Sequence, residues 1–215
     1  NFVGRLDECF VDIGKENSSI KHKNLEIQTA HTIVWLAKVY YKLGDEDQGK
    51  QSMKCFNKAK EIYSRHKADC RKFLVDCDAC EAKIFILRKN FESARIIQEQ
   101  VIDGMVKEYP ESHPRTADAY YCLGRILMLL EKYSLAAKHF NTAISIKSKF
   151  HGGDHPQMAP MYAFLREACV RQPEDPICQK LISKIDAEMK KMGELSEDAK
   201  AKVGTYMKQV KHGSV

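Results

Sequence analysis

The sequence predicts an all-α fold, a solenoid of stacked helical hairpins with capping helices at its C-terminal end. Apolar residues recur at the three- and four-residue spacing of amphipathic helices through most of the 215 residues. Gly and Pro, which interrupt helices, number only 11 and 6. His-Pro occurs at His113–Pro114 and again 42 residues later at His155–Pro156, and Pro suits the first turn of a helix. We therefore expect each His-Pro pair to have a structural role, at the entry to a repeat.

The 42-residue spacing is also visible at the positions where paired helices would pack. Small or apolar residues recur there: Tyr133, Ala136 and Ala143 correspond to Phe91, Ala94 and Val101. One step further back, Val101 and Gln98 correspond to Ala59 and Phe56. A repeated packing pattern of this length predicts a stack in which each helix pair contacts its neighbours.

The expected elements follow in order from this period. In the first pair, Gly44 ends the leading helix, and three extra residues indicate an insertion within Asp45–Gln51. Pro173 and Pro176 delay the last partner helix until about Ile177. The predicted pairs are 28–43 with 50–65, 71–88 with 91–108, and 115–131 with 134–150, followed by a fourth leading helix at about 157–171.

Three regions are predicted along the chain. Residues 1–27 contain an N-terminal helix that would end a truncated repeat, residues 28–172 are the repeats, and residues 173–215 are capping helices with Lys-rich exposed faces. No secretory leader is visible at Asn1, and the chain does not begin with Met, so we expect Asn1 to be a domain boundary.

One segment resembles a known family. Large, small and aromatic residues alternate there as Tyr120-x2-Leu123-Gly124-x2-Leu127, then Tyr133-x2-Ala136-x3-Phe140-x2-Ala143. This resembles the tetratricopeptide (TPR) pattern, in which small residues let two helices approach closely. The 42-residue length and the sequences Glu111–Pro114 and Gly152–Pro156 are similar to the repeats of kinesin light chains. The resemblance implies a right-handed superhelix that acts as a protein-interaction scaffold or adaptor.

A second, weaker resemblance supports an alternative. Four short stretches also look like parts of the helical C-terminal domain of SMYD-type lysine methyltransferases. They are Ser112–Pro114, Gly124, His151–His155 and Leu165–Cys169. That resemblance implies a regulatory helical module detached from an enzyme.

The leading helices of such an array line a concave groove, where a partner peptide would bind. Lys38, Lys83 and Arg125 occupy equivalent positions there, which fits an acidic peptide but also fits ordinary exposed helix faces. Glu167 is the fourth residue of this series, and the other predicted groove positions nearby are His31, Val34, Trp35, Tyr41, Lys42, Asp76, Cys80, Ile86, Leu87, Asp118, Tyr121, Cys122, Met128, Phe164 and Val170. The predicted peptide-binding residues are Val34, Trp35, Lys38, Tyr41, Lys42, Lys83, Ile86, Tyr121, Arg125, Met128 and Phe164. Since exposed ion pairs contribute only about 0.2–1 kcal/mol each, apolar anchors must supply most of the affinity.

The same sequence favours a non-enzyme without cofactor or metal. Cys77-x2-Cys80 has the spacing of zinc ligands, but it lies inside a predicted helix and has no second pair. No Gly-rich phosphate loop and no catalytic triad can be recognised. The 8 Cys fall mostly in apolar helical stretches, which indicates free thiols and a cytoplasmic or nuclear protein.

Charge and hydropathy limit the remaining classes. The net charge of +6 permits an RNA-binding helical repeat, but acidic groove residues such as Asp76, Asp118 and Glu167 make nucleic acid a minor alternative. No apolar run approaches the roughly 20 residues of a membrane span. The oligomeric state and the identity of the partner cannot be predicted.

Overall fold

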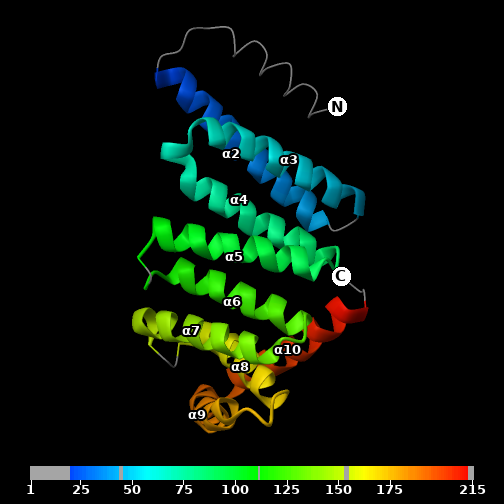
Figure 1. The fold of residues 1–215 in the computed structure, drawn as a ribbon, viewed down its shortest axis with the longest axis vertical. Helices are drawn as coiled ribbons and strands as arrows, with labels where there is room; N and C mark the ends of the chain where they lie inside the picture. The colour runs from blue at the N-terminus through cyan, green and yellow to red at the C-terminus, as the bar shows by residue number, and fades with distance from the viewer. Residues whose placement is uncertain (1–19, 44–45, 111, 153–154, 213–215) are drawn as a thin grey trace. The chain divides into compact units, whose positions relative to one another are not determined.

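The computed structural model describes residues 20–43, 46–110, 112–152 and 155–212 (Figure 1). All regular elements in these ranges are helical. The chain divides into two compact units, Asn1–Leu74 and Val75–Val215, and the division falls within one helix, α4 (Lys67–Leu87). Each unit has buried residues of its own.

The first unit is a helical hairpin followed by the start of α4. The hairpin consists of α2 (Ile20–Leu43) and α3 (Glu46–Arg65), which pack along each other. Ala30, Ala37 and Ala59 are fully buried and let the two helices come close together. The Ser52 hydroxyl donates a 2.7 Å hydrogen bond to the Ala37 carbonyl oxygen across the hairpin.

Within the second unit, the helices from α5 to α8 pack one after another in chain order (Figure 1). Packing joins α5 to α6, α6 to α7, α7 to α8 and α8 to α9, and α10 lies along α8. The unit has one continuous core from Val75 to Met207. Its elements are the second half of α4, α5 (Phe91–Glu108), α6 (Pro114–Leu129), α7 (Tyr133–His151), η1 (Pro156–Met158), α8 (Ala159–Val170), α9 (Pro176–Met192) and α10 (Glu194–His212).

Gly124 sets the closest approach within this core. A Cβ added to Gly124 would lie 2.6 Å from the nearest ring carbon of Phe140, which is fully buried on α7. Ala136, also fully buried, is the matching small residue on α7. The α6–α7 hairpin therefore packs through small residues, as the sequence predicted.

The two His-Pro pairs cap helices. His113 Nδ1 accepts a 3.1 Å hydrogen bond from the backbone N–H of Arg115, and His155 Nδ1 accepts one of 3.2 Å from that of Gln157. In each case the proline that follows occupies the first helical turn. The imidazoles satisfy backbone donors that have no partner within the helix. These contacts give each pair the structural role that its position indicated.

The predicted all-α fold of helical hairpins is confirmed for the described residues, and the helix pairs lie close to their predicted ranges. Three helices begin earlier than predicted. Helix α2 begins at Ile20 and not at residue 28, and α4 begins at Lys67 and not at residue 71. Helix α3 begins at Glu46 and not at residue 50, so the extra residues from Glu46 on lengthen a helix. Most of the predicted N-terminal helix lies outside the described residues, and the division into repeats and cap stays a prediction.

Candidate functional site

The first unit presents part of the predicted peptide-binding set on one face of α2. Trp35, Lys38 and Lys42 follow one another at helical spacing, and the Trp35 side chain is 69% exposed. The Lys38 ammonium lies 5.3 Å from the centre of the Trp35 ring, within range of a cation–π interaction. Val39 lies on the same face and is 51% exposed, but it was not among the predicted peptide-binding residues. Val34 and Tyr41 are half-buried beside this face.

Two predicted anchors of the second unit are buried and present almost no surface to a peptide. Met128 is fully buried in the core, and Phe164 is only 5% exposed. The Phe164 ring packs against Phe140, Tyr121 and Tyr206. Tyr206 belongs to α10, and the repeat pattern of α6 and α8 contained no information about where that helix would lie.

Helix α10 also covers Arg125. The guanidinium carbon lies 4.1 Å from the centre of the Tyr206 ring and 5.6 and 5.8 Å from those of Phe164 and Tyr121. Burial raises the pKa of Tyr121 to about 12, so this phenol stays neutral and does not act as a counter-ion. Arg125 is therefore held among aromatic rings beneath α10 instead of standing in an open groove.

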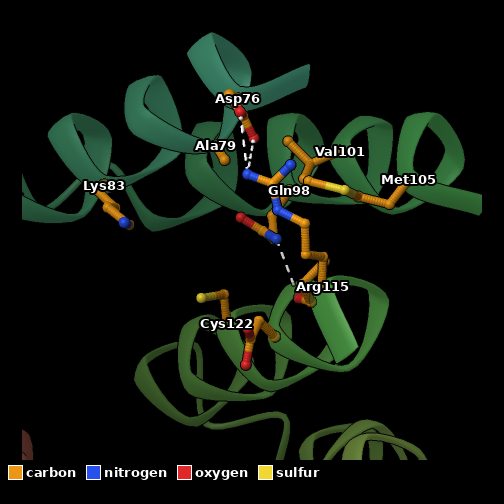
Figure 2. Close-up of a pocket in the computed structure, with 10 residues that line it drawn as sticks. Asp76, Ala79, Lys83, Gln98, Val101, Met105, Arg115 and Cys122 are labelled. Carbon is orange, nitrogen blue, oxygen red and sulfur yellow. Dashed lines mark hydrogen bonds and ion pairs between the residues drawn. The ribbon is translucent and has the colours of Figure 1, made fainter. Parts of the chain in front are cut away.

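Lys83 and Ile86 lie elsewhere in the second unit, on α4. Ile86 is half-buried against the core. Lys83 is exposed and borders a pocket of about 220 Å³ formed by α4, α5 and α6 (Figure 2). The structure brings Lys83 together here with Asp76, Asp118 and Cys122, three of the predicted groove positions. The lining residues are Asp76, Ala79, Lys83, Gln98, Val101, Met105, Arg115, Asp118, Ala119 and Cys122.

Some charged side chains around this pocket have a partner of opposite charge, and one does not. Both Asp76 carboxylate oxygens accept hydrogen bonds of 3.1 Å from Arg115, and Asp118 forms a 2.6 Å ion pair with Lys147. Lys83 forms no ion pair or hydrogen bond with any other residue that the structure describes. The two carboxylates thus have cations of their own, and Lys83 is the cation available to a ligand.

The floor of the pocket is apolar except for one amide. Val101 and Met105 contribute apolar surface from α5. Between them and α6 lies Gln98, 3% exposed, whose Nε2 donates a 3.0 Å hydrogen bond to the Ala119 carbonyl oxygen. Burial raises the pKa of the Cys122 thiol, which favours the protonated form over the nucleophilic thiolate. The pocket is therefore suited to binding a ligand by shape and hydrogen bonding.

Six residues that line this pocket were not among the predicted groove positions: Ala79, Gln98, Val101, Met105, Arg115 and Ala119. Gln98 did carry a signal. It stands 42 residues before Phe140 and 42 after Phe56, so a polar residue occupies a position that is aromatic in the other pairs. Arg115 carried none, because its partner Asp76 lies on a helix 39 residues away in sequence.

The described ranges contain no group of three or more His, Cys, Asp or Glu side chains that could hold a metal ion. Cys77 and Cys80 both lie within α4, and Cys77 is buried. None of the helices described is long and apolar enough to span a membrane.

The tetratricopeptide repeat family matches residues 117–150, which form most of the α6–α7 hairpin. Among solved structures, the chain is similar to the nearly identical kinesin light chain TPR-like repeats of Podosopora anserina, at 13% identity, with a TM-score of 0.63 over 86% of this chain and 95% of that one. A single-residue variant of that protein matches at 14% identity and a TM-score of 0.62, over 86% and 94%. At such low identity the likeness shows the fold alone. No curated protein sequence matches.

Proposed function

Because the chain is a helical-repeat protein of the tetratricopeptide type, we propose that it is a non-catalytic interaction scaffold that binds a peptide segment of a partner protein in the α4–α6 pocket. The observation that carries this proposal is the combination of an apolar floor with Lys83, a cation without a partner among the described residues.

The size of the pocket supports a peptide side chain as the ligand. Pockets for drug-sized molecules and cofactors measure roughly 300–1,000 Å³, whereas an apolar cavity of about 150 Å³ already holds benzene. At about 220 Å³, this pocket accommodates a single side chain of medium size. The rest of the peptide would lie along α4 and α6.

The charges support a partner that carries a carboxylate next to the inserted side chain. Asp76 and Asp118 are neutralised by Arg115 and Lys147, so Lys83 remains to attract an acidic residue of the peptide. An exposed pair of this kind contributes about 0.2–1 kcal/mol, so we expect micromolar affinity that falls at high salt.

The exposed face of α2 offers the same combination of chemistry. Trp35 and Val39 supply apolar surface, and Lys38 and Lys42 supply positive charge. We propose this face as a second peptide contact of the first unit. Tyr121 and Arg125 were predicted to bind the peptide, but they are not part of this proposal. Helix α10 packs on Arg125 and on the adjacent Phe164.

The proposal is tested by selecting random 12-residue peptides displayed on phage against the full chain. Binding of a selected peptide is then measured by fluorescence anisotropy for wild type, Lys83→Glu and Lys107→Glu. Lys107 is exposed on α5 outside the pocket and makes the charge change identical. We expect Lys83→Glu to weaken binding by about 3- to 10-fold at low salt, and Lys107→Glu to leave it unchanged. Equal effects of the two variants, or no enriched peptide, would contradict the proposal.

A further inference from the structure

Gln98 replaces an aromatic core residue. The equivalent residues Phe56 and Phe140 are both fully buried in their own helix pairs, and the Phe140 ring fills the space beside Gly124. Gln98 is almost as deeply buried, at 3% exposure, but its side chain is shorter and polar. Part of the space that a ring would fill is therefore open, and this space belongs to the α4–α6 pocket.

The orientation of the Gln98 amide is fixed by its neighbour. Nε2 donates to the Ala119 carbonyl oxygen at 3.0 Å, and only an N–H group can face a carbonyl oxygen at this distance. Oε1 must then face the other way. Figure 2 shows it directed toward the side of the pocket where Lys83 and Cys122 lie. It has no hydrogen-bond partner among the described residues and is not sealed from solvent.

We propose that the pocket recognises a carboxamide side chain, glutamine or asparagine, of the bound peptide. This inference rests on the proposed peptide-binding function and specifies which class of side chain the pocket binds. The ligand amide donates an N–H to Gln98 Oε1, and its carbonyl oxygen accepts from the Lys83 ammonium. A glutamine side chain has one heavy atom fewer than benzene, so it fits within about 220 Å³.

Other side chains satisfy the pocket less well. An aliphatic side chain displaces water from Gln98 Oε1 and leaves this acceptor unpaired, which is costly in a buried position. A carboxylate has no N–H to donate and would place its negative charge against the Gln98 Oε1 acceptor. A cationic side chain would meet Lys83 and Arg115, while both carboxylates are already paired. The carboxamide alone offers a donor and an acceptor without net charge.

The test is a positional scan of a peptide selected on the full chain. Each position is replaced in turn by Gln, Asn, Glu, Met and Lys, and dissociation constants are measured for wild type and Gln98→Met. At one position we expect wild type to prefer Gln or Asn over Met and Glu by on the order of tenfold. Gln98→Met, which keeps the length of the side chain but has no carbonyl, should lose this preference and favour Met.

Controls for folding, a second variant and an NMR measurement keep the test independent of folding. Circular dichroism and the unfolding temperature establish that Gln98→Met is folded, and Lys83→Met, on an exposed position, should reduce the Gln preference without altering the core. In ¹⁵N-labelled wild type, the Gln98 side-chain NH2 signals should shift with the Gln peptide and shift less with its Met analogue.

The two proposals fail differently. Peptides that depend on Lys83 but show no Gln or Asn preference, or a preference that survives in Gln98→Met, would overturn the inference and leave peptide binding intact. If no peptide is enriched on the wild-type chain, both proposals are wrong.

Discussion

An imidazole followed by proline combines two requirements of a helix start in a single dipeptide. Proline fixes its own φ and needs no partner at the first helical position, while the histidine Nδ1 accepts the next free backbone N–H. The surrounding contacts repeat as well: the His113 ring lies 4.5 Å from that of Tyr109, and the His155 ring 4.9 Å from that of His151. The 42-residue period therefore preserves local geometry in addition to core packing.

At the same scale, Gly124 is required by the close packing of α6 against Phe140. We expect Gly124→Ala to destabilise the second unit by about 1–3 kcal/mol, because the added methyl group meets an aromatic ring that cannot move within a filled core. The matched control is Gly204→Ala on α10, where a Cβ would meet nothing within 4 Å. This control should gain roughly 0.5–1 kcal/mol from helix propensity alone. Urea unfolding followed by circular dichroism measures both changes, and similar effects of the two substitutions would refute the packing argument.

At the scale of elements, local chemistry predicted most of the helices, and the exceptions have physical reasons. His113–Pro114 marked the start of α6 to within one residue, and Pro176 marked that of α9. The start of α3 was misplaced because Gly49, which costs a helix interior only about 1 kcal/mol, does not interrupt it, so the residues from Glu46 on form another helical turn. For the candidate site, Lys83 could be predicted from the repeat, whereas Arg115 could not, since its position depends on a distant ion pair.

The cap of α9 gives a prediction about pH. Asp175 accepts a 2.9 Å hydrogen bond from the Ile177 N–H and a 3.2 Å one from the Ser134 hydroxyl, and the Ile177 bond is the main reason that its pKa is lowered from 3.8. Since the folded state favours the charged form, Asp175 contributes stability above its unfolded pKa, and this contribution is lost as the pH falls through the lower folded value.

Asp175→Asn keeps a capping oxygen but cannot titrate. We therefore expect wild type to exceed Asp175→Asn in unfolding temperature at pH 6, with the difference shrinking as the pH falls below about 4. Thermal unfolding of both proteins between pH 3 and 6 measures this. A difference that stays constant across the range would mean that the Asp175 charge does not contribute to the cap.

At the scale of the whole molecule, the two units differ in how their predicted binding faces are covered. In the first unit Trp35 and Val39 stay exposed on α2, as a periodic helix face suggests. In the second, α10 lies along α8 and buries Phe164, so residues with equivalent repeat positions have different environments. A repeat pattern predicts which face of a helix points away from its partner, but it cannot predict whether a later helix returns to cover that face.

The covering role of α10 gives the last prediction. Ala199, Val203 and Met207 are each at most 5% exposed and belong to the core of the second unit. Burial of Val203 and Met207 alone corresponds to about 3–6 kcal/mol. We therefore expect a chain ending at Gly193 to unfold at a lower temperature and to bind a hydrophobic dye such as ANS before unfolding.

Val203→Asp should reproduce much of the loss of stability within the full chain, because it places an unpaired charge in the core. Thr205→Asp, on the exposed side of the same helix, should change little. If the shortened chain keeps its unfolding temperature and binds no dye, α10 is an appendage, and the repeats before it form a complete core without a cap.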